Sequence, residues 1–206
     1  MLKTFFLLLL CTTFLFSSAI HDATTDGDIA KVKTLLQNKV DINTVNKYGQ
    51  TALILAVYNE HFTLVEYLLN NGAAVNAVMK NGQTALYSAV YLGKNKTIMF
   101  LINKGADVNV VDLKGNTPLH KAAEGGNAGA VRILIEHKAA IDALNNHKST
   151  PLHVAAHLGN EDAVWLLVKS GASDSLINDE EMTPSEVADE EDFGRIVKII
   201  EKYAKK

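Results

Sequence analysis

The same pattern of apolar and polar positions recurs along most of this chain with one fixed, long period. Leucine returns every 33 residues, at Leu53, Leu86, Leu119 and Leu152. Threonine returns at the same interval, at Thr51, Thr84, Thr117, Thr150 and Thr183. Alanine follows in register, at Ala56, Ala89, Ala122, Ala155 and Ala188. Self-similarity at one period is the sequence signature of a repeat architecture, in which stacked units bury a shared core.

Within one period the pattern predicts a turn, a short helix, a tight turn, a longer helix and a loop. Pro118 stands where the first turn of a helix tolerates proline. Gly126 supplies a break before the second helix, whose apolar residues Val131, Leu134 and Ile135 recur at helical spacing. A further glycine position, at which a left-handed residue ends the second helix, is filled by Gly72, Gly105 and Gly171.

The best-formed motifs are Thr117-Pro118-Leu119-His120, Thr150-Pro151-Leu152-His153, Gly72-Ala73-Ala74-Val75-Asn76 and Gly105-Ala106-Asp107-Val108-Asn109. They resemble the ankyrin repeat, and the resemblance covers residues 20–206. It implies an all-α solenoid of six helix-turn-helix units with β-turn fingers. The expected units are residues 20–46, 47–79, 80–112, 113–145, 146–178 and 179–206, with polar outer faces on the two end units.

Some positions depart from the repeat pattern: Ala52 and Ala85 replace proline, Tyr87 replaces histidine, and Lys39 and Lys138 replace the helix-ending glycine. A lysine in a left-handed position costs about 1 kcal/mol. We therefore expect the ends of the second helices in units one and four, near Lys39 and Lys138, to be the looser ones.

The first 19 residues have the pattern of a secretory signal peptide. Lys3 precedes an apolar run from Phe5 to Phe16, and the small residues Ser17, Ser18 and Ala19 follow. The run is shorter than the ~20 apolar residues that a membrane-spanning helix needs. We predict cleavage after Ala19, a mature chain without a stable membrane anchor, and a periplasmic or secreted location.

Composition excludes several classes of function. Twenty basic residues against 23 acidic residues give a net charge of -3, without the basic excess that phosphate binding requires. Loss of the signal peptide would also remove the single cysteine, Cys11. The mature sequence contains no nucleophile-elbow motif and no phosphate-cradling glycine loop. We expect neither catalysis nor a cofactor, and no nucleic-acid partner.

Two histidines on one predicted helix, His153 and His157, are spaced as a zinc-binding pair can be. No glutamate lies between them to act as a base. The resemblance instead implies that His120 and His153 are structural, with hydrogen bonds that tie one turn to the next. We expect no metal site, and a metal protein using this pair stays the weaker alternative.

The resemblance places partner contacts on a concave face made of turn tips and first-helix ends. The expected contact residues are Tyr48, Tyr58, Tyr91, Leu92, Leu113, Lys114, His157 and Leu158. Tyrosine supplies large, rigid contact area, so Tyr48, Tyr58 and Tyr91 are the expected hot spots. A second interpretation remains open: Tyr58, Tyr91, Glu124 and His157 are equivalent positions, and the tyrosines there would only stabilise the array.

The predicted function is a noncatalytic protein-protein interaction module, monomeric and acting after export. It would inhibit, scaffold or stabilise a protein partner, or serve as a secreted effector. The alternative from another class is a structural protein that associates with itself.

Overall fold

The computed structural model describes residues 18–204, which divide at Lys80 into two compact units. The predicted signal peptide lies outside the described residues, except for Ser18 and Ala19. None of the helices within residues 18–204 combines the length and apolar character needed to cross a bilayer.

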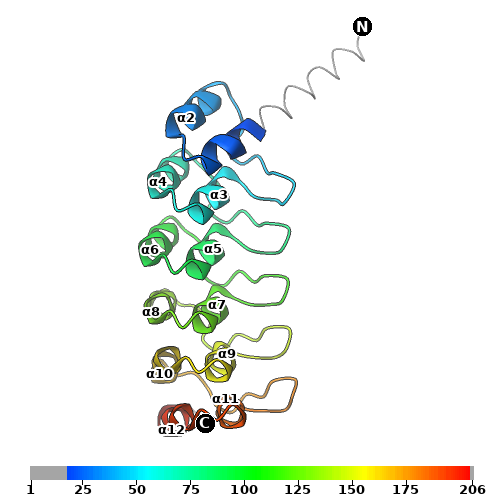
Figure 1. The fold of residues 1–206 in the computed structure, drawn as a ribbon, viewed down its shortest axis with the longest axis vertical. Coiled ribbons are helices and arrows are strands. Elements are labelled where there is room, and N and C mark those ends of the chain that lie inside the picture. Colours follow the sequence, from blue (N-terminus) through cyan, green and yellow to red (C-terminus); the bar gives the residue numbers. More distant parts are fainter. Residues whose placement is uncertain (1–17, 205–206) are drawn as a thin grey trace. The chain divides into compact units, whose positions relative to one another are not determined.

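The first unit contains a helical segment over residues 18–25, followed by α2 (Ile29–Gln37), α3 (Ala52–Tyr58) and α4 (Phe62–Asn70) (Figure 1). Its fully buried side chains include Ile20, Ala23, Val32, Leu53, Leu64 and Leu68. The Nε2 atom of His61 lies 3.0 Å from the carbonyl oxygen of Thr25 and joins the start of α4 to the end of the first helical segment.

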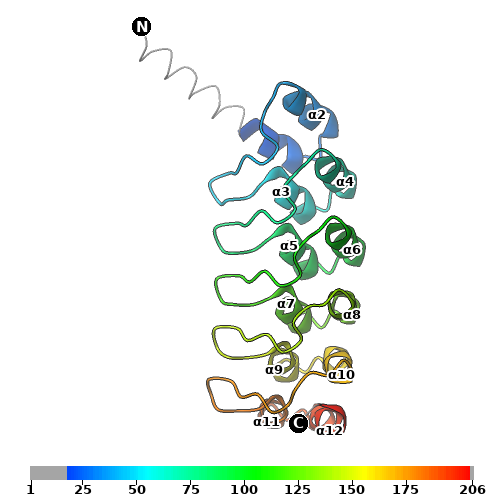
Figure 2. The same ribbon diagram turned by 180° about the vertical axis from the view of Figure 1, so that it is seen from behind.

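The second unit contains four helix pairs: α5 (Ala85–Tyr91) with α6 (Asn95–Asn103), α7 (Pro118–Glu124) with α8 (Ala128–Glu136), α9 (Pro151–His157) with α10 (Glu161–Lys169), and α11 (Pro184–Glu190) with α12 (Gly194–Tyr203). First helices stack on first helices and second helices on second helices (Figure 2). The buried leucine ladder lies between them. Within residues 18–204 no strand forms beyond a single bridge residue at Ser173, so the all-α prediction is confirmed.

The threonine ladder marks the starts of the first helices. Thr51, Thr84, Thr117, Thr150 and Thr183 each adopt an extended backbone and accept a hydrogen bond from the backbone N–H three residues later. This satisfies one of the free donors at a helix N-terminus. Proline occupies the first turn of α7, α9 and α11, as predicted.

A left-handed residue follows each helix from α2 to α11. The φ angles of Lys39 and Lys138 are 62° and 69°, so both lysines take the backbone conformation that the sequence pattern assigns to glycine. Four further non-glycine residues with positive φ were not predicted: Glu60, Lys148, Glu181 and Asp192. The helix-ending position has open space around it, because a Cβ added at Gly105 would meet nothing within 4 Å. Lysine therefore fits there sterically and pays only the backbone strain.

We use the term finger for the tight turns 46–50, 112–116, 145–149 and 178–182, each of which begins with Asn or Asp. In finger 145–149, Oδ1 of Asn145 accepts hydrogen bonds from the backbone N–H groups of His147 (2.9 Å) and Ser149 (3.0 Å). Asn46, Asp112 and Asn178 make the same pair of bonds. Such side-chain bonds fix a turn locally.

Neighbouring fingers in the second unit are joined by one backbone hydrogen bond each. The N–H of Asn146 donates to the carbonyl of Lys114 at 3.0 Å, and the N–H of Asp179 donates to the carbonyl of His147 at 3.0 Å. These bonds hold the finger tips in register, on the side of the first helices (Figures 1 and 2). Side chains of equivalent tip residues are therefore presented as a row.

Candidate binding surface

His120 joins the start of α7 to the next finger with both of its ring nitrogens. Nδ1 accepts a 3.2 Å hydrogen bond from the backbone N–H of Thr117, and Nε2 lies 2.9 Å from the carbonyl oxygen of Ser149. A carbonyl oxygen only accepts, so Nε2 carries the proton and the ring is neutral. Burial lowers the pKa of His120, and the bond to the Ser149 carbonyl opposes this shift.

His153 repeats the arrangement one unit later. Its Nδ1 accepts from the N–H of Thr150 at 3.1 Å, and its Nε2 donates to the carbonyl of Met182 at 3.0 Å. Burial likewise lowers the pKa of His153. The predicted structural role of both histidines, tying one turn to the next, is confirmed.

The metal alternative finds no support in this geometry. His153 is 2% exposed, and both of its nitrogens are occupied by backbone groups. His157 is exposed and places Nδ1 2.9 Å from Oε1 of Glu191. Among residues 18–204, no three His, Cys, Asp or Glu side chains are grouped to hold a metal ion.

Tyr87 occupies the histidine position of its repeat and makes a similar link. Its hydroxyl donates a 2.9 Å hydrogen bond to Oδ2 of Asp112, the first residue of finger 112–116. Burial, followed by the bond to Asp112 and the charge of that carboxylate, raises the pKa of Tyr87 well above its usual value. The departure from histidine at this position therefore preserves a link from α5 to the following finger.

The predicted contact residues of the second unit lie at the surface, with one exception. Tyr91 is 59% exposed, Leu113 71% and Leu158 46%. Lys114 and His157 are also exposed, whereas Leu92, the C-cap residue of α5, is half-buried. In the first unit, Tyr48 and Tyr58 are more than half exposed.

Tyr91 is part of a small network with the next helix pair. The Nζ atom of Lys121 lies 4.8 Å from the centre of the Tyr91 ring and 2.9 Å from Oε1 of Glu124. Lys121 thus connects the equivalent positions 91 and 124. The tyrosine keeps most of its surface free for another molecule.

A row of exposed aliphatic side chains was not predicted, although its signal is present in the sequence. Each of these residues stands immediately before a finger position, and they recur every 33 residues. They are Val45 and Val78 in the first unit and Val111, Leu144 and Ile177 in the second. Each is about half exposed, between 49% and 53%. A single exposed apolar residue is ordinary on a protein surface, so only the shared period of 33 residues distinguishes this row.

Comparison with known protein families identifies the architecture. The model of ankyrin repeats, in three copies, matches residues 20–112 and 93–179. The chain belongs to the ankyrin-repeat family. No curated protein sequence matches it.

Ankyrin repeats generally mediate binding to other proteins, and membership therefore supports a protein-protein interaction module. The fold specifies the mode of binding and not the partner, because stacked repeats of similar shape bind unrelated targets.

A groove of about 710 Å³ lies in the second unit of the ankyrin-repeat domain, and we call it the C-terminal groove. It is lined by Asn145, His147, Ser149, His153, Val154, His157, Asn178, Asp179, Glu180, Met182, Val187, Glu190 and Glu191. Two histidine-carboxylate contacts cross it, His147 Nδ1 to Asp179 Oδ2 at 3.1 Å and His157 Nδ1 to Glu191 Oε1 at 2.9 Å. Of the predicted contact residues, only His157 lines this groove.

Proposed function

We propose that this ankyrin-repeat protein is a noncatalytic binding module that acts after export and engages one protein partner through finger tips and first-helix ends. Its effect on the partner is to inhibit, scaffold or stabilise it. Tyr91, Leu113 and Leu158 carry the proposal, since each is an apolar or aromatic side chain with 46% or more of its surface exposed.

An exposed leucine at a turn tip does not stabilise the fold, because a leucine side chain contributes to stability when it is buried away from water. Leu113 is the most exposed large apolar side chain among residues 18–204, and its backbone is fixed by hydrogen bonds. The N–H of Leu113 donates to the carbonyl of Asn81, and its carbonyl accepts from Nδ2 of Asn146. A rigidly held apolar tip suits a contact residue, because little conformational entropy is lost on binding.

Export is the second part of the proposal, and the composition of residues 1–19 supports it. A periplasmic or secreted protein without cysteine depends on packing alone for stability. The long ladders of buried leucine and alanine meet that requirement.

Partner capture from the compartment in which the protein acts tests the binding function. The chain from Ile20 serves as bait beside a variant with Tyr91→Ala, Leu113→Ser and Leu158→Ser. A matched control, Trp165→Ala, removes a large side chain of α10 that is 45% exposed and lies outside the predicted contact set. Circular dichroism and thermal unfolding check that all three proteins fold alike.

A protein retained by the parent chain and the Trp165→Ala control, but lost by the triple variant, supports the proposed surface. Equal retention by all three would exclude these residues as the contact. Sedimentation of the parent chain separates the self-association alternative, because a mass that rises with concentration contradicts a monomeric binding module.

A further inference from the structure

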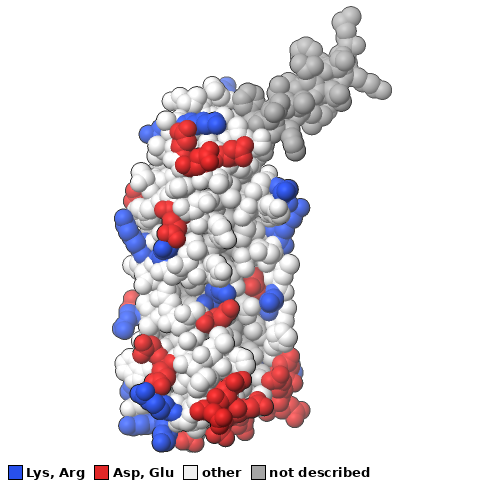
Figure 3. All heavy atoms as spheres, viewed as in Figure 1, with Lys and Arg blue, Asp and Glu red and all other residues white. Residues whose placement is uncertain are grey.

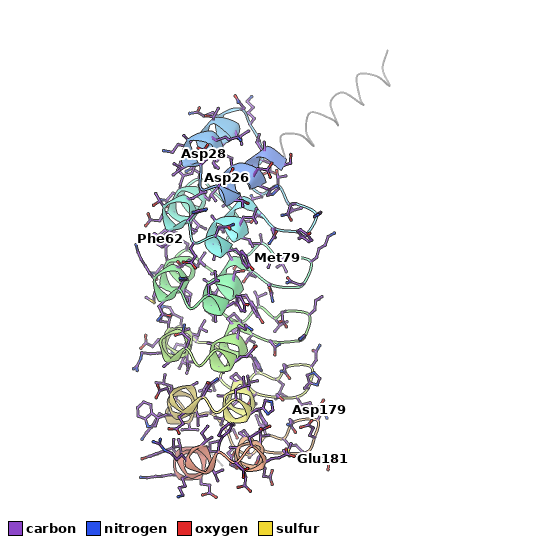
Figure 4. The ribbon with its side chains drawn as sticks, in the orientation of Figure 1. Asp26, Asp28, Phe62, Met79, Asp179 and Glu181 are labelled. Atoms are coloured by element: carbon purple, nitrogen blue, oxygen red, sulfur yellow. The ribbon has the colours of Figure 1, made fainter. Side chains whose placement is uncertain are left out.

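The C-terminal groove has an acidic rim. Four of its lining residues are carboxylates, Asp179, Glu180, Glu190 and Glu191, and none is lysine or arginine. Figure 3 shows acidic side chains gathered over α11 and finger 178–182, whereas basic side chains lie toward α12. Asp179 and its neighbour Glu181 are at the exposed end of that finger (Figure 4).

The four carboxylates are not equivalent. Asp179 and Glu191 face His147 and His157 at 3.1 and 2.9 Å. Glu180 and Glu190 are exposed and form no ion pair with any residue between 18 and 204. These two negative charges therefore line the groove without a cationic partner from the protein itself, and this arrangement favours a cationic ligand.

The floor of the groove differs from its rim. Val154, Met182 and Val187 supply apolar surface, and His153 is held there neutral by its two backbone bonds. Lysine and arginine side chains combine an aliphatic stem with a charged end. An aliphatic stem on the valines and methionine would carry its charged end toward Glu180 or Glu190. The volume of about 710 Å³ lies within the range of ligand-binding pockets.

Other occupants fit less well. A metal ion would need three grouped ligands, which the described part of the chain does not provide. Nucleic acid and anionic lipid would be repelled by the unpaired carboxylates. A basic peptide segment satisfies both the acidic rim and the apolar floor.

We propose that the C-terminal groove recognises an arginine- or lysine-bearing segment of the protein partner. This inference rests on the proposed binding function and specifies the chemistry of the partner at one end of the surface. Finger 178–182 and the end of α11 supply the charges, and α9 supplies the apolar floor together with α11.

Fluorescence anisotropy with a labelled peptide of alternating arginine and glycine tests the inference. The matched probe replaces arginine with citrulline, which has nearly the same shape without the charge. The groove variant is Glu180→Gln with Glu190→Gln, and both residues are exposed and free of ion pairs, so folding should be unaffected. The control variant, Glu136→Gln with Glu201→Gln, removes two exposed carboxylates from α8 and α12 outside the groove.

The parent chain should bind the arginine peptide and not the citrulline peptide. The groove variant should bind it about fivefold to tenfold more weakly, the effect expected of losing two partly solvated charge contacts. The control variant should match the parent. Absence of arginine-peptide binding, equal binding of the citrulline peptide, or equal weakening in the control variant would each overturn the inference.

The failures of the two proposals can be told apart. A partner captured through Tyr91, Leu113 and Leu158 without any response to Glu180→Gln and Glu190→Gln would retain the binding function and reject the basic segment. If no variant loses the captured protein while peptide binding still depends on charge, the contact surface of Tyr91, Leu113 and Leu158 is rejected and the preference of the groove for a basic segment stands.

Discussion

The Nε2 atom of His120 donates a 2.9 Å hydrogen bond to the carbonyl oxygen of Ser149, a residue 29 positions further along the chain. Nδ1 of the same ring accepts from the backbone of Thr117 and completes a capping box at the start of α7. One buried side chain therefore fixes both the start of its own helix and the base of the next finger. The repeated use of this link explains how short units, none of which could bury its own core, hold a common register.

Replacing His120 with alanine should lower the free energy of unfolding by about 2–4 kcal/mol, because it leaves a cavity and removes partners from two buried backbone groups. Urea unfolding followed by circular dichroism measures the change. His147→Ala is the control, since His147 is exposed and makes only a solvated contact to Asp179. It should cost no more than about 1 kcal/mol. Equal losses in the two variants would contradict a special role for the buried ring.

Stability should fall as the pH drops below about 6.5. Burial lowers the pKa of His120 and His153 from the ordinary value of 6.5, so these rings bind protons more readily in the unfolded chain. Their contribution is fully present above pH 6.5 and is lost as the pH falls toward the folded-state pKa. The bond to Ser149 and the charge of Asp112 partly oppose this for His120. Urea unfolding between about pH 8 and pH 5 measures the slope.

A carboxylate effect can be separated from this histidine effect. Hydrogen bonds from Thr183 lower the pKa of Glu186 below its ordinary value of 4.5. The contribution of the Glu186 carboxylate to stability is therefore present above pH 4.5 and is lost only in stronger acid. A His120→Gln, His153→Gln double variant should flatten the slope between pH 8 and pH 5. An unchanged slope in that variant would assign the pH dependence to other groups.

Lys138→Gly should stabilise the protein by about 1 kcal/mol, because glycine removes the strain of a left-handed side chain at the end of α8. Thermal unfolding gives the difference as a rise in midpoint temperature. The gain is partly offset by the greater freedom of glycine in the unfolded chain. A midpoint that falls would show that Lys138 makes a stabilising contact worth more than the strain.

Alanine at two glycine positions provides the complementary test. Gly105→Ala should cost about 1 kcal/mol from backbone strain alone, since a Cβ there meets nothing within 4 Å. Gly126→Ala should cost more, because its Cβ would lie 2.8 Å from Oδ1 of Asn160. The amide of Asn160 caps the end of α7 by donating to the carbonyls of Ala123 and Glu124. Equal costs at both positions would argue against the clash.

The exported protein should begin at Ile20, which intact-mass spectrometry of the purified native protein measures directly. In the structure Ile20 is fully buried and its carbonyl accepts a 2.7 Å bond from the hydroxyl of Thr24, so the first unit needs this residue. Cleavage further along the chain would remove a core side chain. A mass corresponding to a chain from Met1 would refute processing, and with it the proposed export.

Local features were readable from the sequence because each is set by residues close together in the chain. Threonine followed by proline predicted the helix starts, and glycine predicted the left-handed ends. Lys39 and Lys138 were found because they interrupt a glycine ladder. Glu60, Lys148, Glu181 and Asp192 were not predicted, although each also stands at a position that glycine fills in other repeats.

The surface was only partly predictable. Exposure at Tyr91, Leu113 and Leu158 followed from their places at turn tips and helix ends. Leu92, the C-cap residue of α5, is half-buried, a degree of burial that the repeat pattern alone does not give. The contact of Lys121 with the Tyr91 ring depends on how two helix pairs stack, and no spacing along the chain encodes that distance.

The sequence by itself determined the period, the helices, their caps and the class of fold, since these depend on backbone preferences and apolar spacing that recur in every unit. The tertiary structure alone decided which distant side chains meet. It gave Tyr87 the carboxylate of Asp112 as a partner, and it set His157 against Glu191 in an acidic groove with two further unpaired carboxylates. Such pairings arise only when stacking brings residues from successive units within hydrogen-bonding distance.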